Sequence, residues 1–170
     1  MEGVEKGARG HSASAEISLR TVMSCFPTGV TVVGTRDAEG QPLGLTVNSF
    51  TSVSLEPPLV LICINRDANT HDPLLAAGGF TVSILSAPQA EVAARFATRP
   101  SLGRFDGVEW SPAPSGNPVL VGCAAWLDCS IHEAVTAGDH TIILGRTVAA
   151  HWTDQPALLF HRGALGPVGG

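Results

Sequence analysis

The stretch GLTVNSFTSVSLEPPLVL, from Gly44 to Leu61, decides how the rest of the chain is interpreted. Its residues alternate as in a β-strand, but small polar residues stand where a buried strand would be apolar. These residues are Thr46, Asn48, Ser49, Thr51, Ser52 and Ser54. The stretch is either an edge strand whose hydroxyls meet water, or a strand whose polar groups face a ligand rich in hydrogen-bonding atoms.

The segments around this stretch are strand-like as well. β-Branched and apolar runs predict strands at 29–35, 59–65, 80–85, 119–135, 140–152 and 158–160, with one long strand over 43–55, bent at 48–49. Helices are expected at 16–26, at 71–77 and after the capping box at 86–89. Because strands follow one another through turns instead of alternating with helices, we predict a mainly β fold, an antiparallel barrel with a few peripheral helices.

The chain of 170 residues is expected to form one domain over residues 15–163. The Gly/Ser-rich residues 1–14 predict a disordered tail, and residues 164–170 predict a flexible C-terminal tail. No apolar run approaches the roughly 20 residues of a membrane helix, and the N-terminus lacks the core of a signal peptide. We therefore expect a cytoplasmic protein with no membrane contact.

The charge balance excludes several kinds of site. A net charge of −5 argues against a nucleic-acid surface, which needs clustered Lys and Arg. Lys6 is the only lysine and lies in the predicted tail, so neither a P-loop lysine nor a Schiff-base lysine is expected in the domain. The hydrophobic fraction of 44% against 15% charged residues predicts that apolar surface closes against a second copy, as in a homodimer.

The cysteines and histidines give no metal-binding pattern. The four cysteines show no C-x-x-C spacing, and the histidines form no H-E-x-x-H motif, so no metal site is expected. We expect all four thiols to be buried and reduced: Cys25, Cys63, Cys123 and Cys129.

Several motifs then occur in a fixed order along the chain. They are FPTGV (26–30), TVNSFTSVSLEPPLVL (46–61), NT (69–70), FTVSIL (80–85), RFDGVEW (104–110) and AGDHTIILGRTV (137–148). Together they closely resemble the short-chain flavin reductase family over roughly Leu19 to Arg162. The resemblance implies an antiparallel Greek-key split β-barrel of the FMN-binding kind. It also implies an NAD(P)H:flavin oxidoreductase, a homodimer that takes NADH or NADPH, reduces FMN or FAD, and delivers reduced flavin to a partner monooxygenase.

The resemblance also suggests which residues meet the cofactors. Residues expected beside the flavin ring are Thr46, Val47, Asn48 and Ser49; those on its ribityl and phosphate side are Ser52, Val53 and Ser54. Residues expected at the phosphate end are Asn65, Arg66 and Thr70, and those at the flavin tail are Arg95, Phe96 and Ala97. LFHRGAL (159–165) lacks the aromatic residue that the family often has after its Arg-Gly, so no contact is carried over from that end.

His140 has two interpretations. From the residues alone, Gly138-Asp139-His140 is a hairpin turn followed by the first residue of a strand. By resemblance, His140 is the candidate catalytic residue, facing flavin and nicotinamide, where its imidazole would donate a hydrogen bond or balance charge.

Two other functions fit the same pattern. One is a split-barrel oxidase of the pyridoxamine-phosphate oxidase type, and the other is a non-catalytic flavin-binding carrier. The residues do not distinguish FMN from FAD or NADH from NADPH, and they do not identify the partner oxygenase.

Overall fold

The computed structural model describes residues 18–98 and 103–167. The predicted tail at 1–14 and the first residues of the helix expected at 16–26 lie outside this part. The helices are α1 (Leu19–Met23), α2 (His71–Ala77), the 3₁₀ turn η1 (Ala87–Gln89) and α3 (Ala90–Ala97). The capping box is confirmed, because the Ser86 backbone N–H donates to Gln89 Oε1 at 3.0 Å.

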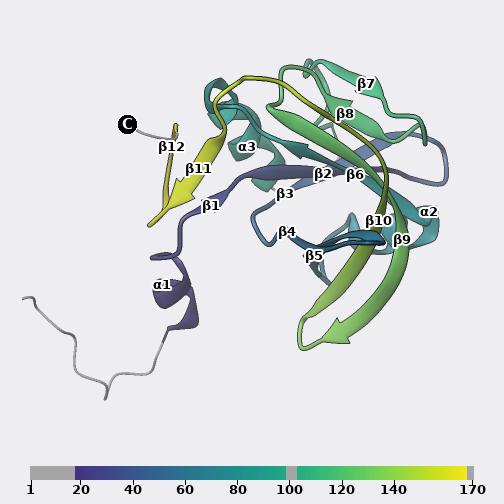
Figure 1. Cartoon of the computed structure of the whole chain (residues 1–170), viewed down its shortest axis with the longest axis horizontal. Coiled ribbons are helices and arrows are strands. Elements are labelled where there is room, and N and C mark those ends of the chain that lie inside the picture. The colour runs from purple at the N-terminus through teal and green to yellow at the C-terminus, as the bar shows by residue number, and fades with distance from the viewer. Residues whose placement is uncertain (1–17, 99–102, 168–170) are drawn as a thin grey trace, which may run out of the picture.

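The strands form an antiparallel barrel with the helices on its outside and at its ends (Figure 1). The largest sheet has the order β3-β2-β6-β9-β10-β5-β4. Its strands are β2 (Thr31–Arg36), β3 (Pro42–Val47), β4 (Thr51–Leu55), β5 (Pro58–Asn65), β6 (Gly79–Ile84), β9 (Ala125–Ala137) and β10 (His140–Trp152). Smaller sheets are formed by β1 (Thr28–Gly29), β11 (Leu158–His161) and β12 (Ala164–Pro167), and by β7 (Trp110–Pro112) with β8 (Pro118–Leu120). The predicted mainly β, antiparallel class is therefore confirmed.

Three predicted element boundaries were wrong. The long strand expected over 43–55 is two strands, β3 and β4, which lie at opposite edges of the large sheet. The strand expected over 119–135 is divided into β8 and β9, because residues 121–124 turn between the small sheet and the large one. Residues 164–167, which were predicted to begin a flexible tail, form β12, and β12 pairs with β11 along its length.

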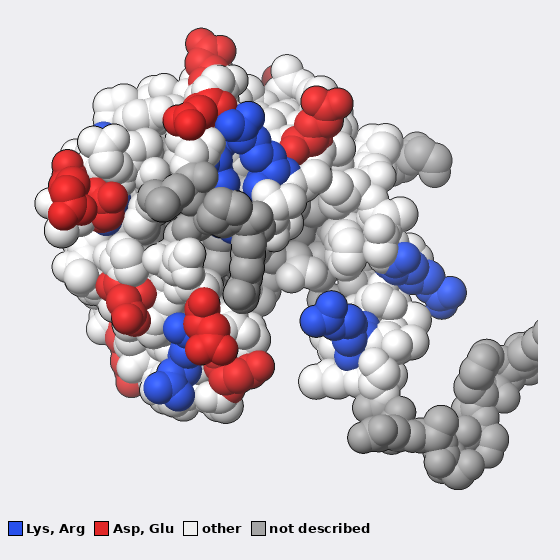
Figure 2. Space-filling model, turned by 180° about the vertical axis from the view of Figure 1, so that it is seen from behind, with Lys and Arg blue, Asp and Glu red and all other residues white. Residues whose placement is uncertain are grey.

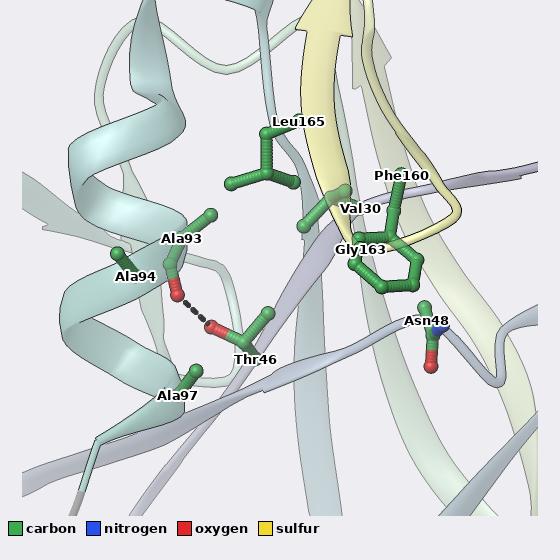
Figure 3. A pocket seen from close by; sticks show the side chains of 9 residues that line it. All are labelled: Val30, Thr46, Asn48, Ala93, Ala94, Ala97, Phe160, Gly163 and Leu165. Carbon is green, nitrogen blue, oxygen red and sulfur yellow. Dashed lines mark hydrogen bonds between the residues drawn. The ribbon is translucent and has the colours of Figure 1, made fainter. Parts of the chain in front are cut away.

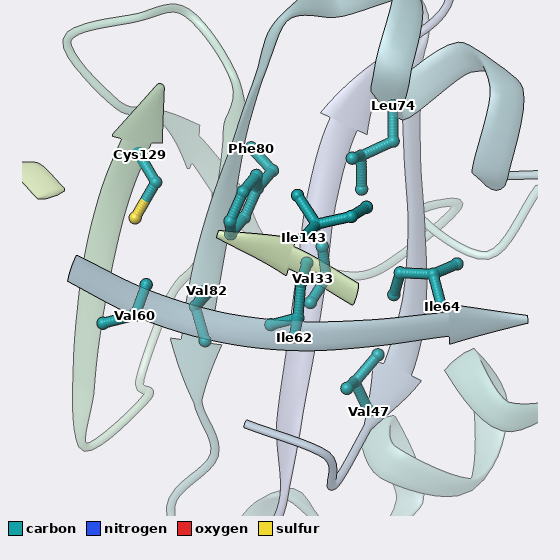
Figure 4. Packing of buried hydrophobic residues seen from close by; sticks show 10 residues of the cluster. All are labelled: Val33, Val47, Val60, Ile62, Ile64, Leu74, Phe80, Val82, Cys129 and Ile143. Atoms are coloured by element: carbon teal, nitrogen blue, oxygen red, sulfur yellow. The ribbon is translucent and has the colours of Figure 1, made fainter. Parts of the chain in front are cut away.

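The main core lies inside the barrel, between the large sheet and α2. In Figure 4, Val33, Ile62 and Ile143 meet near the middle of the cluster, and Leu74 reaches it from α2. All four side chains are fully buried. A second cluster packs α3 against β2 through Phe96, whose ring meets Phe105 edge-on at a centroid distance of 4.8 Å.

The cysteines are only partly as predicted. All four thiols are free, and Cys123 and Cys129 are buried. Burial raises the pKa of the Cys129 thiol to about 11, so it stays protonated at neutral pH. The prediction of a buried thiol was wrong for Cys25, which is exposed, and Cys63 is only half-buried.

The barrel depends on close packing at one glycine of β10. A Cβ atom at Gly145 would lie 2.5 Å from Cζ of Phe80 and 3.1 Å from Cβ of Cys129. Phe80 is fully buried, so its ring has little room to move away. Glycine is therefore the residue that fits at this position of β10, against Phe80 of β6 and Cys129 of β9.

We therefore expect Gly145→Ala to lower the free energy of unfolding by about 1–3 kcal/mol, the usual cost of an overpacked core. Urea denaturation followed by tryptophan fluorescence measures this change. Gly166→Ala is the matched control, because a Cβ there meets no described atom within 4 Å. Equal stabilities of the two variants would show that the contact at Phe80 relaxes freely.

Candidate functional site

A recess of about 310 Å³ opens between α3, the end of β3 and the β11–β12 hairpin (Figure 3). Its walls are mostly apolar, with small side chains on the helix side. The lining residues are Val30, Thr46, Asn48, Ala93, Ala94, Ala97, Phe160, Gly163 and Leu165. We call this space the ring recess, because a flat aromatic group fits between small apolar walls.

Thr46 joins two walls of the ring recess. Its hydroxyl donates to the Ala93 carbonyl oxygen at 2.7 Å, which ties β3 to α3 (Figure 3). Ala93, Ala94 and Ala97 bring the helix to the recess with single methyl groups. A bulkier residue at these positions would fill the space that a ligand needs.

A second recess of about 200 Å³ lies behind the first and shares Thr46 and Ala97 with it. We call it the polar recess, because Asn69, Thr70 and the buried Arg104 line it together with apolar residues. The Arg104 guanidinium donates to the Gly44 carbonyl oxygen at 2.6 Å, which holds the side chain against β3. The two recesses form one continuous surface around the end of β3.

Thr70 places an unpaired, buried hydroxyl at the polar recess. It stands before the first residue of α2, yet its hydroxyl makes no capping hydrogen bond. The residue is 1% exposed, and Oγ1 has no hydrogen-bond partner among the described residues. Buried hydroxyls are nearly always paired, so a group that accepts from Thr70 in the polar recess would remove a real cost. This orphan hydroxyl fits a ligand with an oxygen-rich end.

The structure brings only part of the predicted site set together. Thr46, Asn48 and Ala97 line the ring recess, and Thr70 and Phe96 line the polar recess. The other predicted residues lie elsewhere on the described surface or in the core.

Two residues of the opening stretch serve the fold instead. Val47 is buried in the barrel core. The Ser49 hydroxyl donates to the Cys63 carbonyl oxygen at 2.9 Å and accepts from the Cys63 N–H at 3.2 Å. Ser49 thus pairs with β5 as a strand residue would.

The residues predicted for the flavin side chain lie outside both recesses. Ser52, Val53 and Ser54 are on the edge strand β4, where Ser52 and Val53 are exposed and Ser54 is half-buried. Arg95 donates from its guanidinium to the carbonyl oxygens of Gly103 and Asp106, so it holds the loop after α3. Contacts of these residues with a cofactor stay predictions.

Asn65, Arg66 and His140 gather at another point, where β5 ends and β10 begins. His140 is the register partner of Asn65, and the Arg66 N–H donates to the Asp139 carbonyl oxygen at 3.0 Å. His140 Nδ1 lies 2.8 Å from Asp139 Oδ1. The hydrogen bond from His140 lowers the pKa of the Asp139 carboxyl, so the carboxylate is ionised and Nδ1 is the donor.

The sequence missed most of the wall opposite β3. Phe160, Gly163 and Leu165 come from the β11–β12 hairpin, which the sequence treated partly as a loose tail. No contact was expected from this end, yet it forms one side of the ring recess (Figure 3). The apolar run at 158–160, followed by Arg-Gly, was the available signal for a strand that ends in a tight turn.

Two kinds of feature are absent from the described part of the chain. No group of three His, Cys, Asp or Glu side chains there has the arrangement of a metal site. None of the helices in that part is long and apolar enough to cross a membrane.

Comparisons with known proteins show which family the chain belongs to. Residues 23–169 match the family model described as flavin reductase like domain. The reductase subunit of stachydrine N-demethylase from Rhizobium meliloti is 43% identical over 146 residues, which cover 86% of this chain and 63% of that protein. The reductase component of flavin-dependent trigonelline monooxygenase from Acinetobacter baylyi is 40% identical, covering 86% of this chain and 47% of that protein. The chain thus spans less than two thirds of both curated relatives.

A solved structure matches over a larger share of its own length. The NADH:FAD oxidoreductase of Streptomyces globisporus C-1027, in complex with NAD and FAD fragments, superposes with a TM-score of 0.82 at 45% identity. The match covers 86% of this chain and 88% of that one. Since the family model covers nearly all of the described residues, the chain belongs to the flavin reductase like domain family.

Proposed function

We propose that this protein is an NAD(P)H:flavin oxidoreductase that supplies reduced FMN or FAD to a separate monooxygenase. The observation that carries the proposal is the continuous pair of recesses, in which apolar walls at Ala93 and Ala97 lead to the orphan hydroxyl of Thr70. A flavin has the same order of parts, a flat ring followed by a chain of hydroxyls and a phosphate. The names of the relatives, which include reductase components of oxygenases, support the same activity.

The side chains of the protein would bind and orient the flavin and the pyridine nucleotide. The reaction needs no covalent bond between the protein and either of them. Bound flavin would supply a hydride-accepting ring atom, and NADH or NADPH the hydride. The alanines of α3 allow a ring to lie against the helix, and Thr70 would donate to the oxygen-rich end. His140 lies outside these recesses, at the start of β10, and because its Nδ1 is bonded to Asp139, Nε2 is the ring nitrogen that would contact the nicotinamide. Direct hydride transfer needs mainly that the two rings lie about 3–3.5 Å apart.

We also propose that the protein acts as a homodimer through α1. This helix buries none of its residues, and Leu19, Val22 and Phe26 are 70%, 56% and 63% exposed. Figure 1 shows α1 standing away from the barrel. A second copy that covers these side chains would remove a large apolar area from water.

We also propose a cytoplasmic location. The free thiols fit the reducing cytoplasm, where pyridine nucleotides are available.

Thr70→Val tests the polar recess, because it should weaken flavin binding without lowering the free energy of unfolding of the ligand-free chain. Removal of the orphan hydroxyl should weaken flavin binding about tenfold, which corresponds to the loss of one hydrogen bond of about 1.4 kcal/mol. The free energy of unfolding of the ligand-free chain should stay equal or rise, because an unpaired buried hydroxyl disappears. Fluorescence titration and urea denaturation measure the two quantities. Thr70→Ser, which keeps the hydroxyl, should retain affinity; equal affinity of the valine variant would remove Thr70 from the site.

His140→Ala tests the position of the nicotinamide. If His140 orients the hydride donor, the rate of flavin reduction in stopped-flow experiments should fall about tenfold to hundredfold. Flavin affinity should change much less, because the recess contacts remain. His140→Asn keeps one donor and should give an intermediate rate. Equal single-turnover rates for all three proteins, with flavin bound, would place His140 outside the site.

The double variant Leu19→Ser/Val22→Ser tests the dimer. Sedimentation at micromolar concentration should give about twice the 17.5 kDa chain mass for the unmodified protein and one chain mass for the variant. Leu55→Ser is the matched control, because Leu55 is 88% exposed on β4, away from α1. A monomeric unmodified chain with full reductase activity would contradict the dimer.

A further inference from the structure

A third recess of about 640 Å³ lies between α1 and the β11–β12 hairpin. One wall carries Arg20, Thr21 and Ser24 of α1 and its C-cap, and the other carries Arg162. No acidic residue lines it. Figure 2 shows blue side chains on either side of the space between α1 and the hairpin, with no red side chain beside them. The recess therefore has a local positive charge on a chain whose net charge is −5.

The two arginines of this recess differ from several others in the chain. The guanidinium of Arg36 donates to the carbonyl oxygens of Gly116 and Gly40, and that of Arg95 holds the loop after α3. In contrast, the guanidinium groups of Arg20 and Arg162 make no hydrogen bond or ion pair within the described part of the chain. Both residues line the recess, and no described group accepts from their guanidinium N–H groups.

Arg162 also stands at a backbone position that does not suit an arginine. It forms a two-residue turn with Gly163 between the paired residues His161 and Ala164, and both turn residues have positive φ, 50° and 83°. Such turns strongly favour Asn-Gly, because a Cβ atom is strained at positive φ and the short polar side chain of asparagine offsets this by local hydrogen bonding. A strained residue in a binding region is a sign of function. Arginine at this turn position has a backbone cost that asparagine would largely avoid, and it brings a guanidinium to the recess.

The same residue connects the two walls. The Arg162 backbone N–H donates to the Ser24 carbonyl oxygen at 2.8 Å, at the end of α1. This hydrogen bond holds the hairpin against α1 while the guanidinium stays available. The recess is therefore built by the fold and does not depend on the side chains of its two arginines.

The recess continues into the site described above. Asn48, Phe160 and Gly163 line both this recess and the ring recess. The polar recess lies on the other side of the ring recess, where it shares Thr46 and Ala97. A ligand whose ring reaches Asn48 would thus extend toward Arg20 and Arg162, away from Thr70.

We propose that Arg20 and Arg162 form an anion subsite for the pyrophosphate of a dinucleotide. A pyrophosphate carries two charged groups side by side, and each guanidinium can donate two parallel hydrogen bonds to one of them. The pyrophosphate is that of the pyridine nucleotide, because the proposed function places the phosphate end of the flavin in the polar recess, on the other side of the ring recess. The subsite rests on the proposed function only for the identity of this ligand.

The test uses ADP as the probe and the full chain, with calorimetric titration at low salt. Arg20→Gln and Arg162→Asn should each weaken ADP binding about tenfold, the scale of one lost charged hydrogen bond. Arg146→Gln is the matched control, since Arg146 is exposed on β10 outside all three recesses. Arg162→Asn should also keep or raise the melting temperature, because asparagine suits the turn, so lost binding is not explained by unfolding.

Steady-state kinetics then assign the pyrophosphate. With FMN as the acceptor, a tenfold rise in KM for NADH at nearly constant kcat assigns the subsite to the pyridine nucleotide. A rise in KM for FAD, with KM for NADH unchanged, would contradict this assignment, because it would place the flavin phosphates at these arginines instead of in the polar recess.

Two results would overturn the proposal: no ADP binding by the unmodified chain, or equal ADP affinity in both arginine variants. A chain that binds ADP through these arginines but does not oxidise NADH with any flavin would overturn the proposed function and leave the subsite standing. The two proposals therefore fail separately.

Discussion

Three residues, 48–50, join the two opposite edges of the large sheet, and this connection constrains the whole fold. In a flat sheet, β3 and β4 would be separated by six strand spacings, or about 29 Å. The four Cα–Cα steps from Val47 to Thr51 reach at most about 14 Å. The sheet must therefore roll up until its edges almost meet. The barrel follows from the shortness of one connection as much as from the twist of its strands.

The closure is incomplete, and this is where the recesses lie. Among the described strands, β3 pairs with β2 and β4 pairs with β5, and residues 48–50 cross the seam between the two edges outside any of these strands. Ser49 secures the crossing through its two hydrogen bonds with the backbone of Cys63. Asn48, one residue earlier, is left at the boundary between the ring recess and the arginine-lined recess. The polar residues that looked anomalous in a strand thus divide between closing the seam and lining the site.

Local signals predicted the elements they control, and long-range contacts decided the rest. The capping box at Ser86, the helix end at Gly78 and the break at Pro57-Pro58 each act within a few residues, so the sequence showed them. The division of 43–55 into two edge strands was hidden, because alternation continues through Asn48-Ser49 without a glycine or proline. The hairpin wall of the ring recess was hidden because it depends on a long-range pairing with β1: Thr28 pairs with Phe160, which lies 132 residues further along the chain. The family resemblance predicted that the ligand is a flavin. It did not show which of the predicted residues lie close together at the open seam.

The arrangement of charges explains how two arginine side chains can attract an anionic ligand on a chain whose net charge is negative. The net charge of −5 repels phosphates at long range, but salt screens this repulsion beyond about 8 Å. Within that distance the nearest groups dominate, and the lining of the arginine-lined recess contains two guanidinium groups and no carboxylate. Both arginines are exposed, so water and salt weaken the attraction they exert. An exposed pair of arginines therefore favours weak, reversible binding, so the proposed subsite would bind a dinucleotide and release it again.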